Sequence, residues 1–296
     1  MNLGLKRFTD SKQTSHQREE LRYSIYLLRR SPLALLGALI ITLIILSSIL
    51  APYIAPYGPE KRIWEDKLQP PSATHLFGTD ADGADIFSRV LYGYRLDMAI
   101  ALSVVALAVA IGTLCGCLAG FAGGKTDETI MRVTDIFLAV PGLILAMAIG
   151  AVLGRTPINL VFALAIPWWP IYARLMRGQV QLEKQKLYVD AGRAAGASWS
   201  RLLFRHILPN SIYPVIVNAT LDLGAVILTA SALSFLGFGV QPGAAELGRM
   251  VADGRAYVFT YPWVVTAPGL AILLASLGFN LAGDAARDIL DPRLRR

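Results

Sequence analysis

The sequence YVDAGRAAGASWSRLLFRHILPN, residues 188–210, is a polar and basic stretch between two long apolar segments. Its residue spacing predicts two short helices. The first gathers small and apolar side chains of residues 187–195 on one face and is interrupted at Gly196. The second begins after Ser198, a residue type that favours helix N-termini, and we expect Pro209 to end it. The stretch therefore predicts two helices joined by a tight turn, with basic side chains on their wetter sides.

The composition is typical of an integral membrane protein. Of the 296 residues, 54% are hydrophobic and only 17% are charged, and the mean hydropathy is +0.50. The net charge of +7 is therefore interpreted as loop charge that orients the chain in a bilayer. We expect the lipid bilayer, and no nucleic acid, among the partners.

Six apolar segments approach the roughly 20 residues that a membrane-spanning helix needs. The fourth is the shortest and carries Pro167 and Pro170, which membrane helices tolerate when neighbours satisfy the freed backbone groups. The sequence thus predicts an all-α membrane protein with six transmembrane helices. The segments are residues 33–51, 98–122, 130–153, 158–173, 211–236 and 262–282.

The distribution of positive charge predicts the orientation. Of the 28 Lys and Arg residues, 20 fall on the side of the membrane that holds both termini and the stretch around Gly196. By the positive-inside rule this side is cytoplasmic. We therefore divide the chain into a cytoplasmic tail, a first span with an extracytoplasmic segment, a five-helix core with a cytoplasmic loop at 174–210, and a second cytoplasmic tail. Their ranges are 1–30, 31–97, 98–283 and 284–296.

The extracytoplasmic segment, roughly residues 52–97, is rich in Pro, Gly and Asp. This composition predicts turns, followed by a short helix from Ile86. Such a segment suits a contact surface, although turn residues of this kind also occur in any solvated loop.

Residues 188–210 resemble the "EAA" loop of ABC importer permeases, which has an acidic residue, two small residues, a glycine and a later Leu-Pro. Two positions differ: Asp190 replaces the usual Glu, and Gly192 replaces the usual Ala. The resemblance implies a coupling helix that docks into a groove on a separate ATPase subunit. The residues it assigns to coupling are Asp190, Ala191, Gly192, Gly196, Ala197, Leu208 and Pro209.

Residues 77–95 look like the peptide, oligopeptide and nickel branch of these permeases, in its second, C-type permease. The matching residues are Phe77, Gly78, Thr79, Asp80, Gly83, Asp85, Ser88, Arg89, Gly93 and Arg95, whereas Ala84 stands where that branch usually has Arg. The resemblance extends over residues 32–294. It implies an extracytoplasmic contact through Gly78, Thr79, Asp80, Asp85 and Arg89.

Ionisable residues inside apolar segments are functional candidates because a charge in lipid is costly. Asp135 lies three residues after Arg132, so we expect these two to form an ion pair across one helical turn. Asn218 and Asp222 share one face of the fifth segment. They either line a translocation pathway or form a hydrogen bond between packed helices.

The sequence gives little support for nucleotide binding, metal binding or catalysis. Gly124, Lys125 and Thr126 look like the end of a phosphate-binding loop, but position 119 is Ala and an apolar helix precedes them. The three histidines are scattered in the sequence, and Cys115 and Cys117 point apart on a helix and are interpreted as packing residues. We predict no catalytic residue, no metal site and no cofactor in this chain.

The resemblance implies a type I ABC importer permease in a bacterial or archaeal plasma membrane. Its implied partners are a second homologous permease, two ABC ATPases that bind ATP and Mg, and an extracytoplasmic solute-binding protein. Peptides are the expected cargo, with nickel chelates, glutathione and oligosaccharides as alternatives. A stand-alone carrier and a membrane enzyme that uses Asp222 are further hypotheses.

Overall fold

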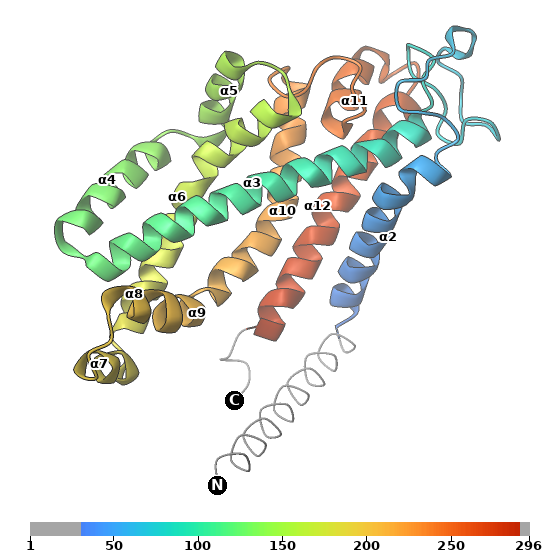
Figure 1. Cartoon of the computed structure of the whole chain (residues 1–296). Helices are drawn as coiled ribbons and strands as arrows, with labels where there is room; N and C mark the ends of the chain where they lie inside the picture. The colour runs from blue at the N-terminus through green and yellow to red at the C-terminus, as the bar shows by residue number, and fades with distance from the viewer. Residues whose placement is uncertain (1–30, 291–296) are drawn as a thin grey trace.

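The computed structural model describes residues 31–290, and the predicted tails at 1–30 and 291–296 lie outside this range. The described chain is helical (Figure 1). Its helices are α2 (Pro32–Ile54), α3 (Ile86–Ala122), α4 (Gly124–Ala139), α5 (Gly142–Leu153), α6 (Pro157–Lys184), α7 (Leu187–Ala194), α8 (Trp199–Arg201), α9 (Leu208–Ser211), α10 (Tyr213–Phe235), α11 (Leu247–Gly254) and α12 (Trp263–Leu290).

Five of these helices are long and apolar enough to cross a membrane: α2, α3, α6, α10 and α12. The third predicted span, residues 130–153, is divided into α4 and α5, which meet at an angle of 87°. Pro141 causes the break, since it lacks a backbone N–H and forces Val140 into an extended conformation with φ −97° and ψ 133°. The prediction of one continuous third span was therefore wrong, although six passes are retained when the bent pair is counted as one.

Helix α3 begins much earlier than the predicted second span. The short helix expected from Ile86 and the span expected from residue 98 form one helix of 37 residues. Asp85 caps its N-terminus by accepting a hydrogen bond from the Ser88 N–H at 2.8 Å, and Gly123, with φ +68°, ends it. No proline lies between these two residues, so the helix continues from the external segment into the span.

Small residues let α3 and α6 pack closely along their length. A Cβ atom at Gly112 would lie 2.4 Å from the Cβ atom of Tyr172, and one at Gly116 would lie 2.8 Å from that of Met176. Gly120 repeats the pattern against Val180, at 2.9 Å. Glycine at every fourth residue therefore brings two helices into direct backbone contact, which is how membrane helices associate without a hydrophobic driving force.

Ion pairs hold α4 against α6. Asp127 accepts two hydrogen bonds from Arg177, at 2.5 and 2.6 Å, and Asp135 accepts one from Arg174 at 2.5 Å. The expected pair of Asp135 with Arg132 was wrong. Arg132 is exposed and lies 3.8 Å from Glu128, because its face of α4 points away from the rest of the chain.

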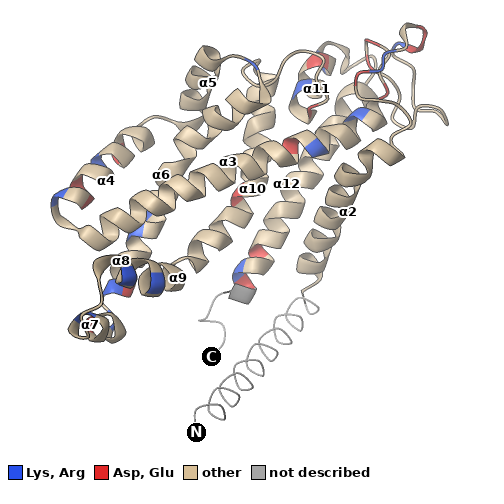
Figure 2. Cartoon of the chain, in the orientation of Figure 1, with Lys and Arg blue, Asp and Glu red and all other residues tan. Residues whose placement is uncertain are grey.

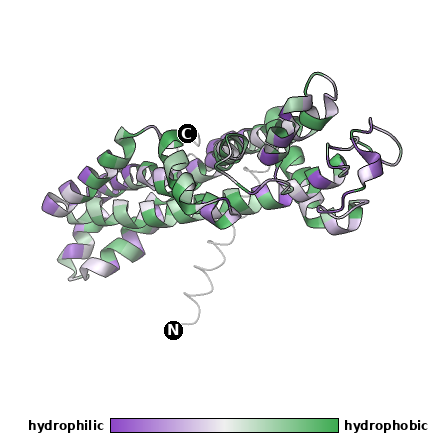
Figure 3. Ribbon diagram, turned by 90° about the horizontal axis from the view of Figure 1, so that it is seen from above, coloured by the Kyte–Doolittle hydropathy of each residue, from purple (hydrophilic) through white to green (hydrophobic). Residues whose placement is uncertain are grey.

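The bundle has two different ends. We call the end that carries residues 55–85 and α11 the α11 end, and the opposite end, with α7 to α9, the α7 end (Figure 1). Charged residues gather at these two ends and are sparse between them (Figure 2). Hydrophobic residues make up much of the helices (Figure 3). This pattern is typical of a bundle whose middle lies in lipid.

Candidate functional site

The stretch that resembles the EAA loop forms a compact unit at the α7 end, residues 187–211, which we call the hairpin. After α7 the chain turns through Gly196, whose φ is +75°. The Ala197 N–H donates to the Gly192 carbonyl at 3.0 Å, and the Gly196 N–H donates to the Arg193 carbonyl at 2.9 Å. These two bonds make a Schellman motif, which requires a left-handed residue at Gly196 and so favours glycine there.

The second half of the hairpin does not end at Pro209, contrary to the prediction. Helix α8 continues into a π-helical turn, Leu202–Ile207, and then into α9, which contains Pro209 near its start. A proline lacks the N–H of a regular helix and clashes with the carbonyl four residues earlier. The wider π-turn before Pro209 accommodates this loss, with the Leu208 N–H bonded to the Leu203 carbonyl.

Buried contacts fix the hairpin to α6. Leu203 and Ile207 are fully buried in a cluster with Val180 and Phe121. Glu183, the one buried charged residue of α6 within the described chain, accepts a hydrogen bond from the Tyr188 hydroxyl at 2.6 Å. Burial and this carboxylate raise the pKa of Tyr188 to about 12. The hairpin is therefore seated on the end of α6.

The predicted coupling residues lie on the outer part of this unit. Asp190, Ala191, Gly196 and Pro209 are exposed, and Gly192, Ala197 and Leu208 are partly buried. A Cβ atom on Gly192 would lie 2.8 Å from Leu202 Cδ2, so the leucine occupies the space that an alanine would need. Around these small residues, Leu187, Trp199 and Phe204 are large, apolar and exposed. The hairpin thus presents a surface of small residues bordered by apolar ones.

At the α11 end, Asp85 is the centre of a buried hydrogen-bond network. Its Oδ2 accepts from the Ser88 hydroxyl at 2.6 Å, and its Oδ1 lies 3.0 Å from Nδ1 of His75. The other ring nitrogen of His75 is 3.5 Å from Asp66, and the Tyr57 ring stacks on the imidazole at 5.2 Å. His75 escaped the sequence reasoning, because its partners lie nine and ten residues away in an irregular segment.

A second network ties this segment to the loop before α11. Arg89 forms a buried ion pair with Asp80 and donates to the carbonyls of Gly243 and Ala244, at 3.1 and 2.9 Å. Thr79 accepts from the Gln69 N–H at 2.8 Å and donates to the Asp66 carbonyl. These contacts join parts of the chain that are far apart in sequence.

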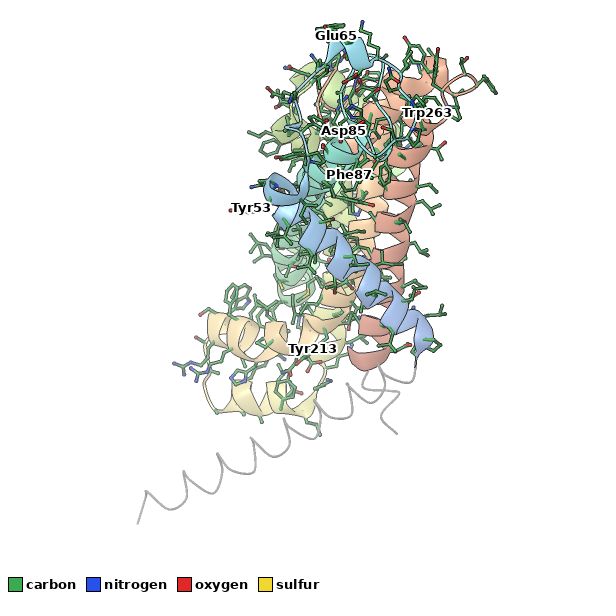
Figure 4. The ribbon with its side chains drawn as sticks, turned by 90° about the vertical axis from the view of Figure 1, so that its right-hand side faces the viewer. Tyr53, Glu65, Asp85, Phe87, Tyr213 and Trp263 are labelled. Atoms are coloured by element: carbon green, nitrogen blue, oxygen red, sulfur yellow. The ribbon has the colours of Figure 1, made fainter. Side chains whose placement is uncertain are left out.

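The residues predicted to touch an extracytoplasmic partner lie mostly inside this segment. Gly78, Thr79, Asp85 and Arg89 are buried, and Asp80 is half-buried. Figure 4 places Asp85 inside the α11 end and Glu65 at its outer tip. Ala84 is 1% exposed, so the arginine usual at this position would not fit without displacing its neighbours. The motif residues shape the segment, while neighbours such as Trp64 and Glu65 form its surface.

In the middle of the bundle, Asp222 links α10 to α6. Its Oδ2 accepts hydrogen bonds from Trp168 Nε1 at 3.0 Å, the Tyr172 hydroxyl at 2.6 Å and Asn218 Nδ2 at 3.2 Å. The interhelical hydrogen bond that the sequence left as one of two alternatives is therefore present. Trp168 and Tyr172 were not predicted, because only the tertiary fold brings them to Asp222.

Two buried carboxylates meet at the start of α11. Asp97 accepts from the Leu247 N–H at 3.3 Å, and Glu246 accepts from the Gly248 and Arg249 N–H groups at 3.2 and 2.6 Å. Burial raises the pKa of Glu246 to about 7. No local pattern predicted this pair, since Asp97 and Leu247, the residue after Glu246, are 150 residues apart.

The chain has clear relatives. The family described as the binding-protein-dependent transport system inner membrane component matches residues 112–296, and the N-terminal TM domain of oligopeptide transport permease C matches residues 21–71. The chain is 46% identical over 269 residues to the probable D,D-dipeptide transport system permease protein DdpC of Escherichia coli K12, covering 91% of this chain and 90% of the relative.

Two further relatives are similar over comparable lengths. The di/tripeptide transport system permease protein DppC of Pseudomonas aeruginosa is 47% identical, with 88% of each chain covered. The glutathione transport system permease protein GsiD of Pectobacterium atrosepticum is 41% identical, with 90% of this chain and 89% of the relative covered.

Among solved structures, the MetNI methionine ABC transporter matches with a TM-score of 0.55 at 20% identity, covering 68% of this chain and 96% of that chain. An amino acid ABC transporter matches with a TM-score of 0.53 at 16% identity, covering 71% and 94%. These likenesses show the fold, and the family match covers more than half of the chain. The chain belongs to the family of binding-protein-dependent transport system inner membrane components, as a multi-pass permease subunit of an ABC importer.

Proposed function

We propose that this permease subunit imports peptides, and that it forms the translocation pathway with a second, homologous permease. The support for the cargo comes from relatives of 43 to 47% identity whose names are dipeptide, D,D-dipeptide and di/tripeptide transport permeases. Glutathione, a peptide-like molecule, is the cargo named for relatives of 41 and 43% identity and is the second candidate.

The hairpin is the observation that carries the proposed mechanism. It is a stiff unit, because a Schellman turn closes it and buried side chains seat it on α6. Its outer surface consists of small residues at Ala191, Gly192 and Gly196, against which another protein surface can pack closely. One of the two ATPase subunits, which would bind ATP and Mg, docks at this surface, and the other docks on the second permease. Their closure moves the hairpin and, through α6, the transmembrane helices.

The orientation follows from the same assignment. The α7 end carries the basic stretch of residues 174–210 and therefore faces the cytoplasm, together with both termini. The α11 end then faces outward and receives a solute-binding protein. The solute-binding protein touches the exposed residues around Trp64 and Glu65. The buried network of Asp80, Asp85 and Arg89 supports these residues from within.

The second permease covers an apolar surface on the bent helices. Ile136 of α4, Ile144 of α5 and Val152 of α5 are 68%, 59% and 86% exposed. Among the described helices, α4 packs against α3 and α6, and α5 packs chiefly against α6. A homologous subunit at this position would enclose a pathway between the two copies of α4 and α5.

Replacement of Gly196 by tryptophan tests the docking assignment. A Cβ atom at Gly196 meets nothing within 4 Å, so the new side chain would project from the hairpin surface instead of disturbing the interior. Gly124→Trp is a matched control, because Gly124 also has a positive φ of +54° and open space around it but lies outside the hairpin. We expect Gly196→Trp to abolish ATP-dependent peptide uptake and co-purification of the ATPases, with normal amounts of permease in the membrane.

The control should keep both uptake and ATPase binding. Normal uptake in Gly196→Trp would show that the hairpin surface does not dock the ATPases. Equal loss in both variants would show that the defect comes from strain at a left-handed residue and not from the docking surface.

A further inference from the structure

Asp222 is a carboxylic acid residue in the middle of the membrane-spanning part of the chain, and it has no cationic side chain beside it among the described residues. It is the tenth of the 23 residues of α10. Among the described residues, no Lys, Arg or His side chain lies within ion-pair distance of it. A charge at this depth is costly, and such residues generally face a protein interior or a water-filled path and have a functional partner.

The two oxygens of the Asp222 carboxylate have different surroundings. Oδ2 accepts all three hydrogen bonds, from Trp168, Tyr172 and Asn218. Oδ1 accepts none from the described residues, yet it is absent from the set of fully enclosed polar atoms that lack a partner. The three donors therefore hold the side chain in place and leave one carboxylate oxygen that is neither hydrogen-bonded nor fully enclosed among the described residues.

The packing of α10 against α6 does not by itself explain why residue 222 is an aspartate. A neutral asparagine carbonyl has two lone pairs and could accept two of the three hydrogen bonds. It would avoid most of the cost of an ion in the membrane. A metal ion is a poor partner, because no group of three or more His, Cys, Asp or Glu side chains within residues 31–290 is placed to hold one. A single fixed carboxylate oxygen suits a small organic cation such as a primary ammonium group.

We infer that Asp222 Oδ1 binds the positively charged amino terminus of the peptide during its passage through the membrane. This inference depends on the proposed function, and it specifies which chemical group of the cargo the permease recognises. Peptides with a free amino terminus carry this cation at neutral pH, because the α-amino pKa is about 8. The residue is a binding residue for the moving cargo, and Trp168, Tyr172 and Asn218 position it.

The test measures transport by the full complex in proteoliposomes. The solute-binding protein is saturated beforehand with one of two dipeptides of equal sequence, one with a free amino terminus and one N-formylated, so that its own affinity does not set the rate. We expect Asp222→Asn to slow import of the free-amino peptide about tenfold, the size of a lost charge-assisted hydrogen bond. Import of the formylated peptide should change less than about twofold, and Asp222→Glu should restore much of the selectivity.

Asp284→Asn is the matched control. It also removes one carboxylate from the inner part of a spanning helix, but it lies on α12, and no hydrogen bond or ion pair among the described residues joins it to α6 or to Asp222. We expect it to leave the ratio of the two import rates unchanged.

A second variant keeps the test informative if Asp222→Asn fails to fold. Asn218→Lys places an ammonium group one turn from Asp222, where it supplies a permanent cation and leaves the carboxylate available to Trp168 and Tyr172. We expect it to slow import of the free-amino peptide selectively, as expected for Asp222→Asn. An equal effect on both peptides in either variant, or no effect, would show that Asp222 only joins α10 to α6. Absence of ATP-dependent import of any peptide by the wild-type complex would instead overturn the proposed function.

Discussion

The hairpin at the α7 end and the segment at the α11 end use their characteristic residues in opposite ways. The Asp190 side chain in the hairpin is 60% exposed, and its only ion pair among the described residues is with Arg193 on the same surface. The Asp85 side chain at the α11 end is 1% exposed and accepts hydrogen bonds from Ser88 and His75. One set of residues forms a surface, and the other forms the interior that supports a surface. Substitutions at the two ends should therefore differ in whether they damage folding or docking.

The largest loss of stability is expected from a substitution at Arg89, at the α11 end. Arg89→Ala removes one partner of a buried ion pair and leaves Asp80 and two carbonyls without their donor, which should cost about 3–5 kcal/mol. We expect a fall in the unfolding temperature of the purified permease in lipid nanodiscs. An unfolding temperature equal to that of the wild type would mean that the α11 end does not depend on this network.

Two glycines with nearly the same φ angle provide the next test. Gly83 has φ +76° and Gly196 has φ +75°, but a Cβ atom at Gly83 would lie 1.9 Å from the Ile63 carbonyl oxygen, whereas one at Gly196 meets nothing within 4 Å. Gly83→Ala should cost about 3 kcal/mol, from strain and steric overlap together, and Gly196→Ala about 1 kcal/mol, from strain alone. Thermal unfolding of the two variants measures the difference. Equal losses would show that the backbone conformation alone decides the cost.

Solution pH should act on the two ends in different ranges. The pKa of Glu246 is raised from 4.5 to about 7. Between these values the unfolded chain loses the proton while the folded chain keeps it, so stability is highest below about pH 4.5, falls as the pH rises towards 7 and then stays level. The loss is up to about 3 kcal/mol, given 1.36 kcal/mol per pKa unit.

Glu246→Gln should weaken this dependence, and unfolding temperatures measured from pH 5 to 8 would show it. The hairpin contributes no such change in that range, because Tyr188, whose pKa is raised from 10.0 to about 12, destabilises the fold only as the pH rises from about 10 to 12. A wild-type profile that is flat from pH 5 to 8 would contradict the buried position of the Glu246 carboxyl group.

The smallest effect is expected at the exposed ion pair of the hairpin. Arg193→Ala removes a pair whose side chains are 45% and 60% exposed, and such pairs contribute less than about 1 kcal/mol. The unfolding temperature should stay within error of the wild type. If the hairpin is a docking surface, the variant should still reduce the amount of ATPase that co-purifies. A loss of stability similar to that of Arg89→Ala would show that the hairpin is as dependent on its charges as the α11 end.

Local signals in the sequence were reliable where a single residue decides the backbone. The turn at Gly196 and the start of the helix after Ser198 were predicted, since a break in apolar spacing and a favourable capping residue coincide there. Pro209 misled the prediction because a π-turn before it compensates for the missing N–H. Pro141 was overlooked inside a continuous apolar segment, although it bends the third span by 87°.

The sequence by itself determined the membrane class, the six passes, the family and the position of the hairpin, because hydrophobic length, helix-breaking residues and short motifs are local properties of a chain. Only the tertiary structure decided which motif residues are buried, and which residues surround Asp222, Asp85 and Glu246. Trp168 is 54 residues from Asp222, and Leu247 is 150 residues from Asp97. Contacts of this kind depend on how whole helices pack against one another, and no local pattern of residue types specifies that packing.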